Sequence, residues 1–129
     1  MGKPAADAAA QTDAPSPQSV GTAIDFEHLA RMTFGERNLE REVLTLFDRQ
    51  AGILISRMRD ATPEVVSAYA HTLKGSARGI GAWRVAEAAD AVETNAATGA
   101  VERLYAAVNE TKALIADILR PYSRSDVSR

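Results

Sequence analysis

A histidine, a lysine, a glycine and an arginine lie close together in the segment HTLKGSARGIGA, which spans residues 71–82. Lys74 and Gly75 follow His71 within about one turn of a helix, and Arg78 follows within about two turns. The imidazole of an ordinary histidine is mostly neutral at neutral pH, so it can act as a nucleophile without an adjacent base. Neighbouring cations favour that neutral form and would attract an anion brought to it.

Gly75 is an unusual residue for the interior of a helix. Glycine costs about 1 kcal/mol relative to alanine in such a position. The glycine therefore suggests that empty space is needed beside His71, although a glycine tolerated near a helix end is the plainer alternative. Together, His71, Lys74 and Gly75 describe an accessible imidazole nucleophile, with clearance for a bulky partner and positive charge for a phosphoryl group.

Helical geometry predicts that His71 is exposed. At about 100° per residue, the direction opposite His71 holds the residues expected in the core, namely Val66, Tyr69, Leu73, Ser76 and Ile80. Ser67, Lys74, Gly75 and Arg78 share the side of His71. We therefore expect a partner to bind around His71 through four further positions, which are Ser67, Ala68, Thr72 and Arg78.

The elements that must position these residues are helices, because no stretch alternates apolar and polar residues long enough to indicate a strand. A short helix is expected over about 25–33, with Asp25 as its N-cap and an interruption at Gly35. Its buried apolar residues are expected to be Phe26, Leu29, Ala30 and Met32. A long helix is expected over about 36–59. Gln50 and Arg57 are expected to be solvated, and the core stripe is expected to consist of Leu39, Val43, Leu46, Phe47, Ile53 and Leu54.

Capping signals divide the rest of the chain into three helices. Thr62 and Pro63 begin a helix that runs to about residue 80, where Gly79 and Gly81 allow a turn. The next helix, about 83–97, has core positions at Val85, Ala86, Ala89, Val92 and Ala96. Gly99 is expected as a left-handed C-cap. The last helix, about 101–119, ends before Pro121 and buries Val101, Leu104, Tyr105, Val108, Ile115, Ile118 and Leu119.

Four long helices joined by short loops must mostly be antiparallel neighbours. The sequence therefore predicts an all-α fold, an antiparallel up-down-up-down four-helix bundle with a short additional N-terminal helix. We expect a disordered tail over residues 1–22, the bundle over 23–120 and a flexible C-terminal tail over 121–129.

Composition narrows the classes of function. The chain has 129 residues, a formal net charge of -2 and no cysteine, which favours one domain in a reducing compartment and disfavours nucleic-acid binding. No apolar run has the length of a membrane span or a signal peptide, so we expect a cytoplasmic protein. A metal site is disfavoured because His28 and His71 have no partner at ligand spacing, and His28 is expected at the surface of the first helix.

The segment from residue 71 resembles the signature of histidine phosphotransfer (HPt) domains. That signature is H-x-x-K-G followed by small residues, an apolar residue and glycine, here His71, Lys74, Gly75, Ile80 and Gly81. The stretches IDFEHLARMTFGERNLEREVLTLF and AWRVAEAADAVETNAATGA are similar to the flanking helices, with Val92 and Glu93 as the apolar-acidic pair. The resemblance covers about residues 24–119. Arg78 departs from it, since a small or uncharged residue is more usual there.

The resemblance implies a phosphocarrier. His71 would accept a phosphoryl group from a receiver-domain aspartyl phosphate and pass it to a response-regulator aspartate, Lys74 would compensate phosphoryl charge, and Gly75 would give clearance. Expected partners are receiver domains of response regulators or of a hybrid histidine kinase. Mg²⁺ would be bound by the receiver, and this chain, a monomer, would bind no cofactor.

No ATP-binding domain and no H-E/D-x-x-x-P box is visible in the sequence, so phosphorylation directly from ATP is not expected. The alternative is a helical interaction module that is not phosphorylated, in which the glycine face is a docking groove.

Overall fold

The structure is a computed structural model that describes residues 22–95 and 98–120. Within these ranges the regular structure is entirely helical, which confirms the predicted all-α class. The helices are α2 (Phe26–Met32), α3 (Arg37–Met58), α4 (Pro63–Ile80), α5 (Trp83–Thr94) and α6 (Thr98–Leu119). The predicted tails lie outside the described residues, apart from Thr22.

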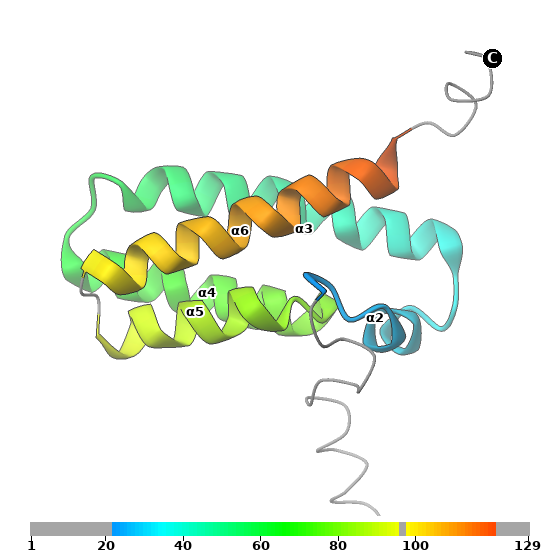
Figure 1. The fold of residues 1–129 in the computed structure, drawn as a ribbon, viewed down its shortest axis with the longest axis horizontal. Helices are drawn as coiled ribbons and strands as arrows, with labels where there is room; N and C mark the ends of the chain where they lie inside the picture. Colours follow the sequence, from blue (N-terminus) through cyan, green and yellow to red (C-terminus); the bar gives the residue numbers. More distant parts are fainter. Residues whose placement is uncertain (1–21, 96–97, 121–129) are drawn as a thin grey trace, which may run out of the picture.

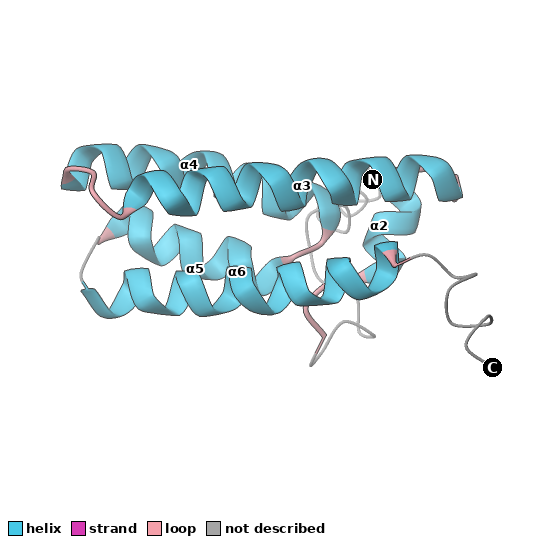
Figure 2. Cartoon of the chain, turned by 90° about the horizontal axis from the view of Figure 1, so that it is seen from above, coloured by secondary structure: helices cyan, strands magenta, loops and turns pink. Residues whose placement is uncertain are grey.

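The four long helices form two layers (Figure 1). In that view α3 and α6 lie side by side in one layer, and α4 and α5 lie in the other. The layers are joined where α3 contacts α4 and where α5 contacts α6, so the four helices enclose one core. Figure 2 shows the same packing from above, with the short α2 at one end of the bundle against α4.

The core is built from the buried stripe of each helix. Helix α3 contributes Leu44, Phe47 and Ala51, and α4 contributes Leu73 and Ala77, all nearly inaccessible to solvent. The further buried apolar residues of α5 and α6 are Val85, Ala86, Ala89, Val92, Ala100, Leu104, Val108 and Ile115. Alanines at several of these positions let the helix backbones approach closely.

Helix α2 is fixed to the C-terminal end of α4 by Asp25. As predicted, the Asp25 side chain caps α2 by accepting from the backbone N–H of His28. Its other carboxylate oxygen accepts from Nε1 of Trp83 at 2.9 Å, and its backbone N–H donates to the carbonyl of Gly81. Gly81 lies at the turn predicted after α4 and has a left-handed conformation (φ +81°), and a Cβ on it would lie 2.9 Å from the Asp25 carbonyl oxygen.

His28 is buried, so its prediction as a surface residue is wrong. The side chain is 1% exposed, its Nε2–H donates to the carbonyl of Arg78 at 2.9 Å, and its ring meets Trp83 edge to face. The sequence pattern does not reveal the burial of His28, because this hydrogen bond joins two residues that lie 50 positions apart in the sequence. His28 is therefore part of the contact between α2 and α4.

Four residues predicted in the core are exposed. Phe26 and Met32 of α2 face solvent because this short helix buries only the side that carries His28 and Leu29. Leu46 and Ile53 of α3 are 60% and 45% exposed, because the core stripe of α3 runs through Leu44, Phe47, Ala51, Leu54, Ile55 and Met58 instead. Gln50 and Arg57 are solvated, as expected.

Gly99 does not form the predicted C-cap. Helix α6 begins at Thr98, three residues earlier than predicted, so Gly99 lies in its first turn, and the C-cap of α5 is Asn95 in extended conformation. The predicted core position Ala96 and the predicted stop at Pro121 lie outside the described residues. The described part of α6 nevertheless ends at Leu119, as expected.

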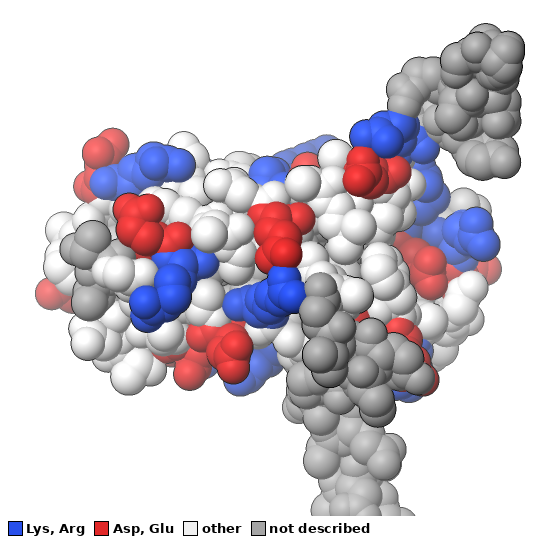
Figure 3. Space-filling model, viewed as in Figure 1, with Lys and Arg blue, Asp and Glu red and all other residues white. Residues whose placement is uncertain are grey.

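Acidic and basic side chains are interspersed on the face shown in Figure 3. One cross-layer ion pair joins Arg84 of α5 to Glu110 of α6, with both side chains about half exposed. Among the described residues, no helix is long and apolar enough to cross a membrane.

Candidate functional site

Helix α4 holds the candidate site in a fixed orientation. The Thr62 side chain caps its N-terminus by accepting from the backbone N–H of Val65, Pro63 occupies its first turn, and Gly81 ends it, all as predicted. The buried side of α4 is Val66, Ala70, Leu73, Ala77 and Ile80. Because this stripe is anchored in the core, the opposite side must face solvent, and the side chain of His71 is 68% exposed there.

Glu93 of α5 orients the imidazole of His71. Nδ1 of His71 lies 2.7 Å from Oε2 of Glu93. A carboxylate oxygen can only accept a hydrogen bond, so Nδ1 carries the proton and donates it to Glu93. The neutral ring is then unprotonated at Nε2, and its lone pair is free for a bond to an incoming atom.

Lys74 holds the same carboxylate from the other side. Nζ of Lys74 lies 2.6 Å from Oε1 of Glu93 and 3.1 Å from Oδ1 of Asp90, which is one turn earlier on α5. The Lys74 side chain is only 14% exposed, whereas Asp90 is 57% exposed. The side chain of Lys74 therefore packs against α5 at the centre of an ionic network. The carboxylates of Glu93 and Asp90 fix its position.

The network shifts the pKa of two groups. Hydrogen bonds from Lys74 first and from His71 second lower the pKa of Glu93 below its usual 4.5. Hydrogen bonds to Glu93 first and to Asp90 second raise the pKa of Lys74 above its usual 10.5. Glu93 is therefore an anion and Lys74 a cation across the neutral range, which keeps Nδ1 of His71 in the donor role.

Gly75 lies in open space one turn after His71. Apart from its two chain neighbours and the adjacent backbone of α4, a Cβ on Gly75 would have no heavy atom within 4 Å, and the same is true of Gly79. No close contact inside the chain therefore requires glycine at either position. The helical conformation of α4 does not require it either, because neither residue has a positive φ.

The positions predicted to bind a partner differ in what their side chains do. Ala68, Thr72 and Arg78 are exposed around His71, as expected from helical geometry. Ser67 is half-buried, and its hydroxyl donates to the backbone carbonyl of Glu93 at 3.1 Å. Ser67 thus connects α4 to α5 at the residue that orients His71.

Sequence reasoning missed Asp90 and the role of Glu93. The resemblance singled out Glu93 without a role, and Asp90 was not singled out. One signal was available, because the two acidic residues are three apart on a helix whose other side is apolar, so they share one face. Which residue of α4 that face meets depends on the packing of α4 against α5, which the linear sequence does not give.

No group of three or more histidine, cysteine, aspartate or glutamate side chains that could hold a metal ion occurs in residues 22–95 and 98–120. The carboxylates beside His71 are each engaged by Lys74, so the cation that neutralises them belongs to the protein itself.

Comparison with known proteins gives one match. Neither a search of curated proteins nor a search of solved structures found a similar chain. Residues 37–120 match the family model described as Hpt domain, which is more than half of the chain and includes α3, α4, α5 and α6. Hpt domains carry out histidine phosphotransfer with receiver domains in two-component phosphorelays. The chain, whose helices present one oriented and exposed histidine, belongs to the Hpt domain family.

Proposed function

We propose that this protein is a phosphorelay intermediate, built as an antiparallel up-down-up-down bundle that presents His71 to receiver domains. It would accept a phosphoryl group on His71 from a receiver aspartyl phosphate and transfer it to a response-regulator aspartate. The observation that carries the proposal is the hydrogen bond from Nδ1 of His71 to Glu93, because it leaves Nε2 as the nucleophile on a side chain that is 68% exposed.

The transfer needs no base on this chain. Nε2 of His71 attacks the phosphorus, an N–P bond forms, and the O–P bond of the aspartyl phosphate breaks with its electron pair returning to the carboxylate. The ring gains positive charge, and its Nδ1–H still donates to the Glu93 carboxylate, which stabilises that charge. In the second step an aspartate of the acceptor attacks the phosphorus, and the N–P electron pair returns to Nε2.

Lys74 contributes charge near the transferred group. An ammonium has three N–H donors, and the contacts with Glu93 and Asp90 engage two of them. One donor is left for a phosphoryl oxygen when the group is carried by His71. The Lys74 cation also offsets the Glu93 carboxylate, which would otherwise repel the phosphoryl oxygens.

Gly75 supplies clearance for the receiver. A side chain here would meet nothing inside the chain, so the space beside His71 is open to a partner. Ala68, Thr72 and Arg78 would border that contact, while Ser67 supports it through Glu93. We expect Mg²⁺ to be bound by the receiver, where it would neutralise phosphoryl charge, and no cofactor to be bound by this chain.

Incubation with a panel of phosphorylated receiver domains tests the proposal. We expect acid-labile, base-stable phosphoryl label on the wild-type protein and none on His71→Gln, with unchanged far-UV circular dichroism for the variant. Label that persists on His71→Gln would contradict the assignment. If instead His71→Gln still regulates its partner normally, the protein acts as a docking module that is not phosphorylated.

A further inference from the structure

The outer face of α3 carries apolar residues that the bundle does not cover. Leu46 and Ile53 are 60% and 45% exposed. Together with Glu42 and Arg57 they lie within an arc of about 60° when α3 is viewed down its axis. The core residues of α3 point roughly 140° away from the centre of this arc. We call these four residues, Glu42, Leu46, Ile53 and Arg57, the α3 outer face.

The spacing of the four residues on the α3 outer face is symmetric about the midpoint of the face. Four positions separate Glu42 from Leu46, seven separate Leu46 from Ile53, and four separate Ile53 from Arg57. The two inner residues are apolar, and the two outer residues have opposite charge. A two-fold axis between positions 49 and 50 would therefore place Leu46 of one copy against Ile53 of another, and Glu42 near Arg57.

The charged ends of this face are available for a partner. Within the described residues, neither Glu42 nor Arg57 has a side-chain hydrogen bond or ion pair, and both are exposed. Exposed apolar residues seven apart, flanked by opposite charges, are typical of a helix that packs against another helix.

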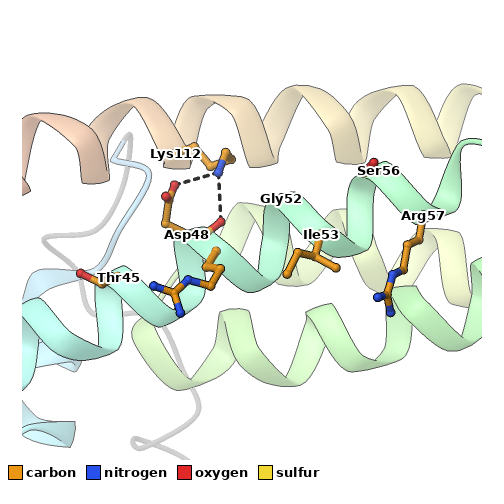
Figure 4. A pocket seen from close by; sticks show the side chains of 8 residues that line it. Thr45, Asp48, Gly52, Ile53, Ser56, Arg57 and Lys112 are labelled. Atoms are coloured by element: carbon orange, nitrogen blue, oxygen red, sulfur yellow. Dashed lines mark hydrogen bonds and ion pairs between the residues drawn. The ribbon is translucent and has the colours of Figure 1, made fainter.

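Surface hollows lie at both ends of the face. One hollow, of about 620 Å³, is lined by Glu42, Leu46, Arg41, Thr45 and Leu119. The other, of about 540 Å³, includes Ile53 and Arg57 in its lining (Figure 4). In Figure 4 Lys112 reaches from α6 to Asp48, while Ile53 and Arg57 project away from Lys112. Two-fold pairing would bring Ile53 of one copy to the hollow beside Leu46 of the other.

We propose that the α3 outer face binds the same face of a second copy of this chain, with the two α3 helices antiparallel. Such a contact is isologous, which is the commonest way in which identical chains associate. The proposal replaces the monomer that the sequence led us to expect, and it does not depend on the phosphotransfer function.

The geometry limits the strength of this dimer. From Glu42 to Arg57 the face is about 22 Å long. A single helix-on-helix contact of this length buries less than the roughly 1,600 Å² of a standard stable interface. Arg49, which is also exposed, would lie beside its own copy near the two-fold axis and oppose association. We therefore expect a weak dimer that forms as the protein concentration rises.

The dimer would leave both phosphorylation sites accessible. The α3 outer face belongs to the layer of α3 and α6, whereas His71 lies on the layer of α4 and α5 next to Glu93. On α4, Ser76 is directed to α3, where its hydroxyl donates to Gln50. His71 lies about 140° from Ser76 around the helix, so it points away from α3.

Sedimentation velocity of the full chain over a wide concentration range tests the association. We expect the weight-average sedimentation coefficient to rise toward that of a dimer for the wild type, and to stay at the monomer value for Leu46→Glu and Ile53→Glu. Val65→Glu, at another exposed apolar residue, is the matched control and should still dimerise. A wild type that stays monomeric at every concentration would overturn the proposal, as would a dimer that survives both glutamate variants.

Charge exchange tests the antiparallel register. Glu42→Arg and Arg57→Glu should each weaken the dimer about tenfold, a change equivalent to about 1.4 kcal/mol, and the double variant should restore it. Glu87→Arg, at an exposed glutamate of α5, should have no effect. Failure of the double variant to restore association would overturn this register.

A single engineered cysteine tests the position of the axis, because the chain has no native cysteine. Arg49→Cys should form a disulfide-linked dimer on mild oxidation, since positions 49 in the two copies would face each other. Glu87→Cys should form it many times more slowly. Equal rates of cross-linking for the two variants would place the contact elsewhere and overturn the proposal.

Discussion

Nδ1 of His71 donates to the carboxylate of Glu93 at 2.7 Å, and this contact joins α4 to a residue 22 positions later on α5. It decides which ring nitrogen is free to react. Without Glu93 the ring could carry its proton on either nitrogen, and the ring would lose its orientation. Lys74 also fixes this carboxylate, because its ammonium group contacts Oε1 of Glu93, the oxygen that His71 does not contact.

Removing the Glu93 carboxylate should slow phosphotransfer. Glu93→Ala is expected to lower the transfer rate about tenfold, at the low end for loss of a hydrogen bond to a charged group because the site is exposed. Glu93→Gln should be affected less, since its amide oxygen can still accept from Nδ1. Nitrogen-15 NMR of the imidazole should show the Nδ1–H tautomer in the wild type and a mixture in Glu93→Ala.

Asp90→Asn provides the matched control for these variants. Asp90 contacts Lys74 but not His71, so its loss should leave the tautomer of His71 unchanged. If Glu93→Ala and Asp90→Asn have equal effects on the tautomer, Glu93 does not orient the ring.

The ionic network should make stability depend on pH at both extremes. The pKa of Glu93 is lowered from 4.5, so its contribution to stability is present above pH 4.5 and is lost as the pH falls through the lower folded value. The pKa of Lys74 is raised from 10.5, so its contribution is present below pH 10.5 and is lost as the pH rises through the higher folded value.

Denaturant unfolding of His71→Gln with and without Glu93→Gln measures this dependence, because the imidazole at position 71 is absent from both proteins. The difference in free energy of unfolding between the two should shrink as the pH falls below 4.5. A difference that grows as the pH falls would contradict the lowered pKa of Glu93.

Gly75→Ala should separate stability from function. Alanine is expected to stabilise α4 by about 0.5 to 1 kcal/mol, because no neighbouring side chain opposes its Cβ. The added methyl group should nevertheless slow phosphotransfer about tenfold or more by displacing the receiver from His71. Thermal unfolding and single-turnover transfer measure the two effects.

Gly79→Ala is the control for that substitution. Its Cβ also meets open space, so the gain in stability should be similar, but it lies two turns from His71 and should slow transfer less. Equal transfer rates for wild type and Gly75→Ala would show that the receiver does not need this clearance.

Gly81→Ala should have the opposite effect on stability. Gly81 has φ +81°, and a Cβ here would lie 2.9 Å from the backbone oxygen of Asp25. We expect a loss of about 2 kcal/mol or more in the free energy of unfolding, from the left-handed conformation and from displacement of α2. A variant as stable as Gly79→Ala would show that α2 moves away at little cost.

Local signals in the sequence predicted most of the helices. Asp25, Thr62, Pro63 and Gly81 act at the helix ends where they were expected, because capping depends on neighbours within a few residues. Apolar periodicity also predicted the exposed side of α4 with His71 on it. The same periodicity misassigned Leu46 and Ile53, since apolar residues occur on two sides of α3 and only contacts with other helices decide which side is buried.

The sequence by itself determined the helical class, the side of α4 that carries His71 and the motif typical of the family, because these depend on spacing along one helix. The tertiary structure alone decided that Glu93 orients His71, that Lys74 is held by two carboxylates and that His28 is buried beneath Arg78. Each of those contacts joins two helices, and the distance between side chains on different helices depends on how the helices pack.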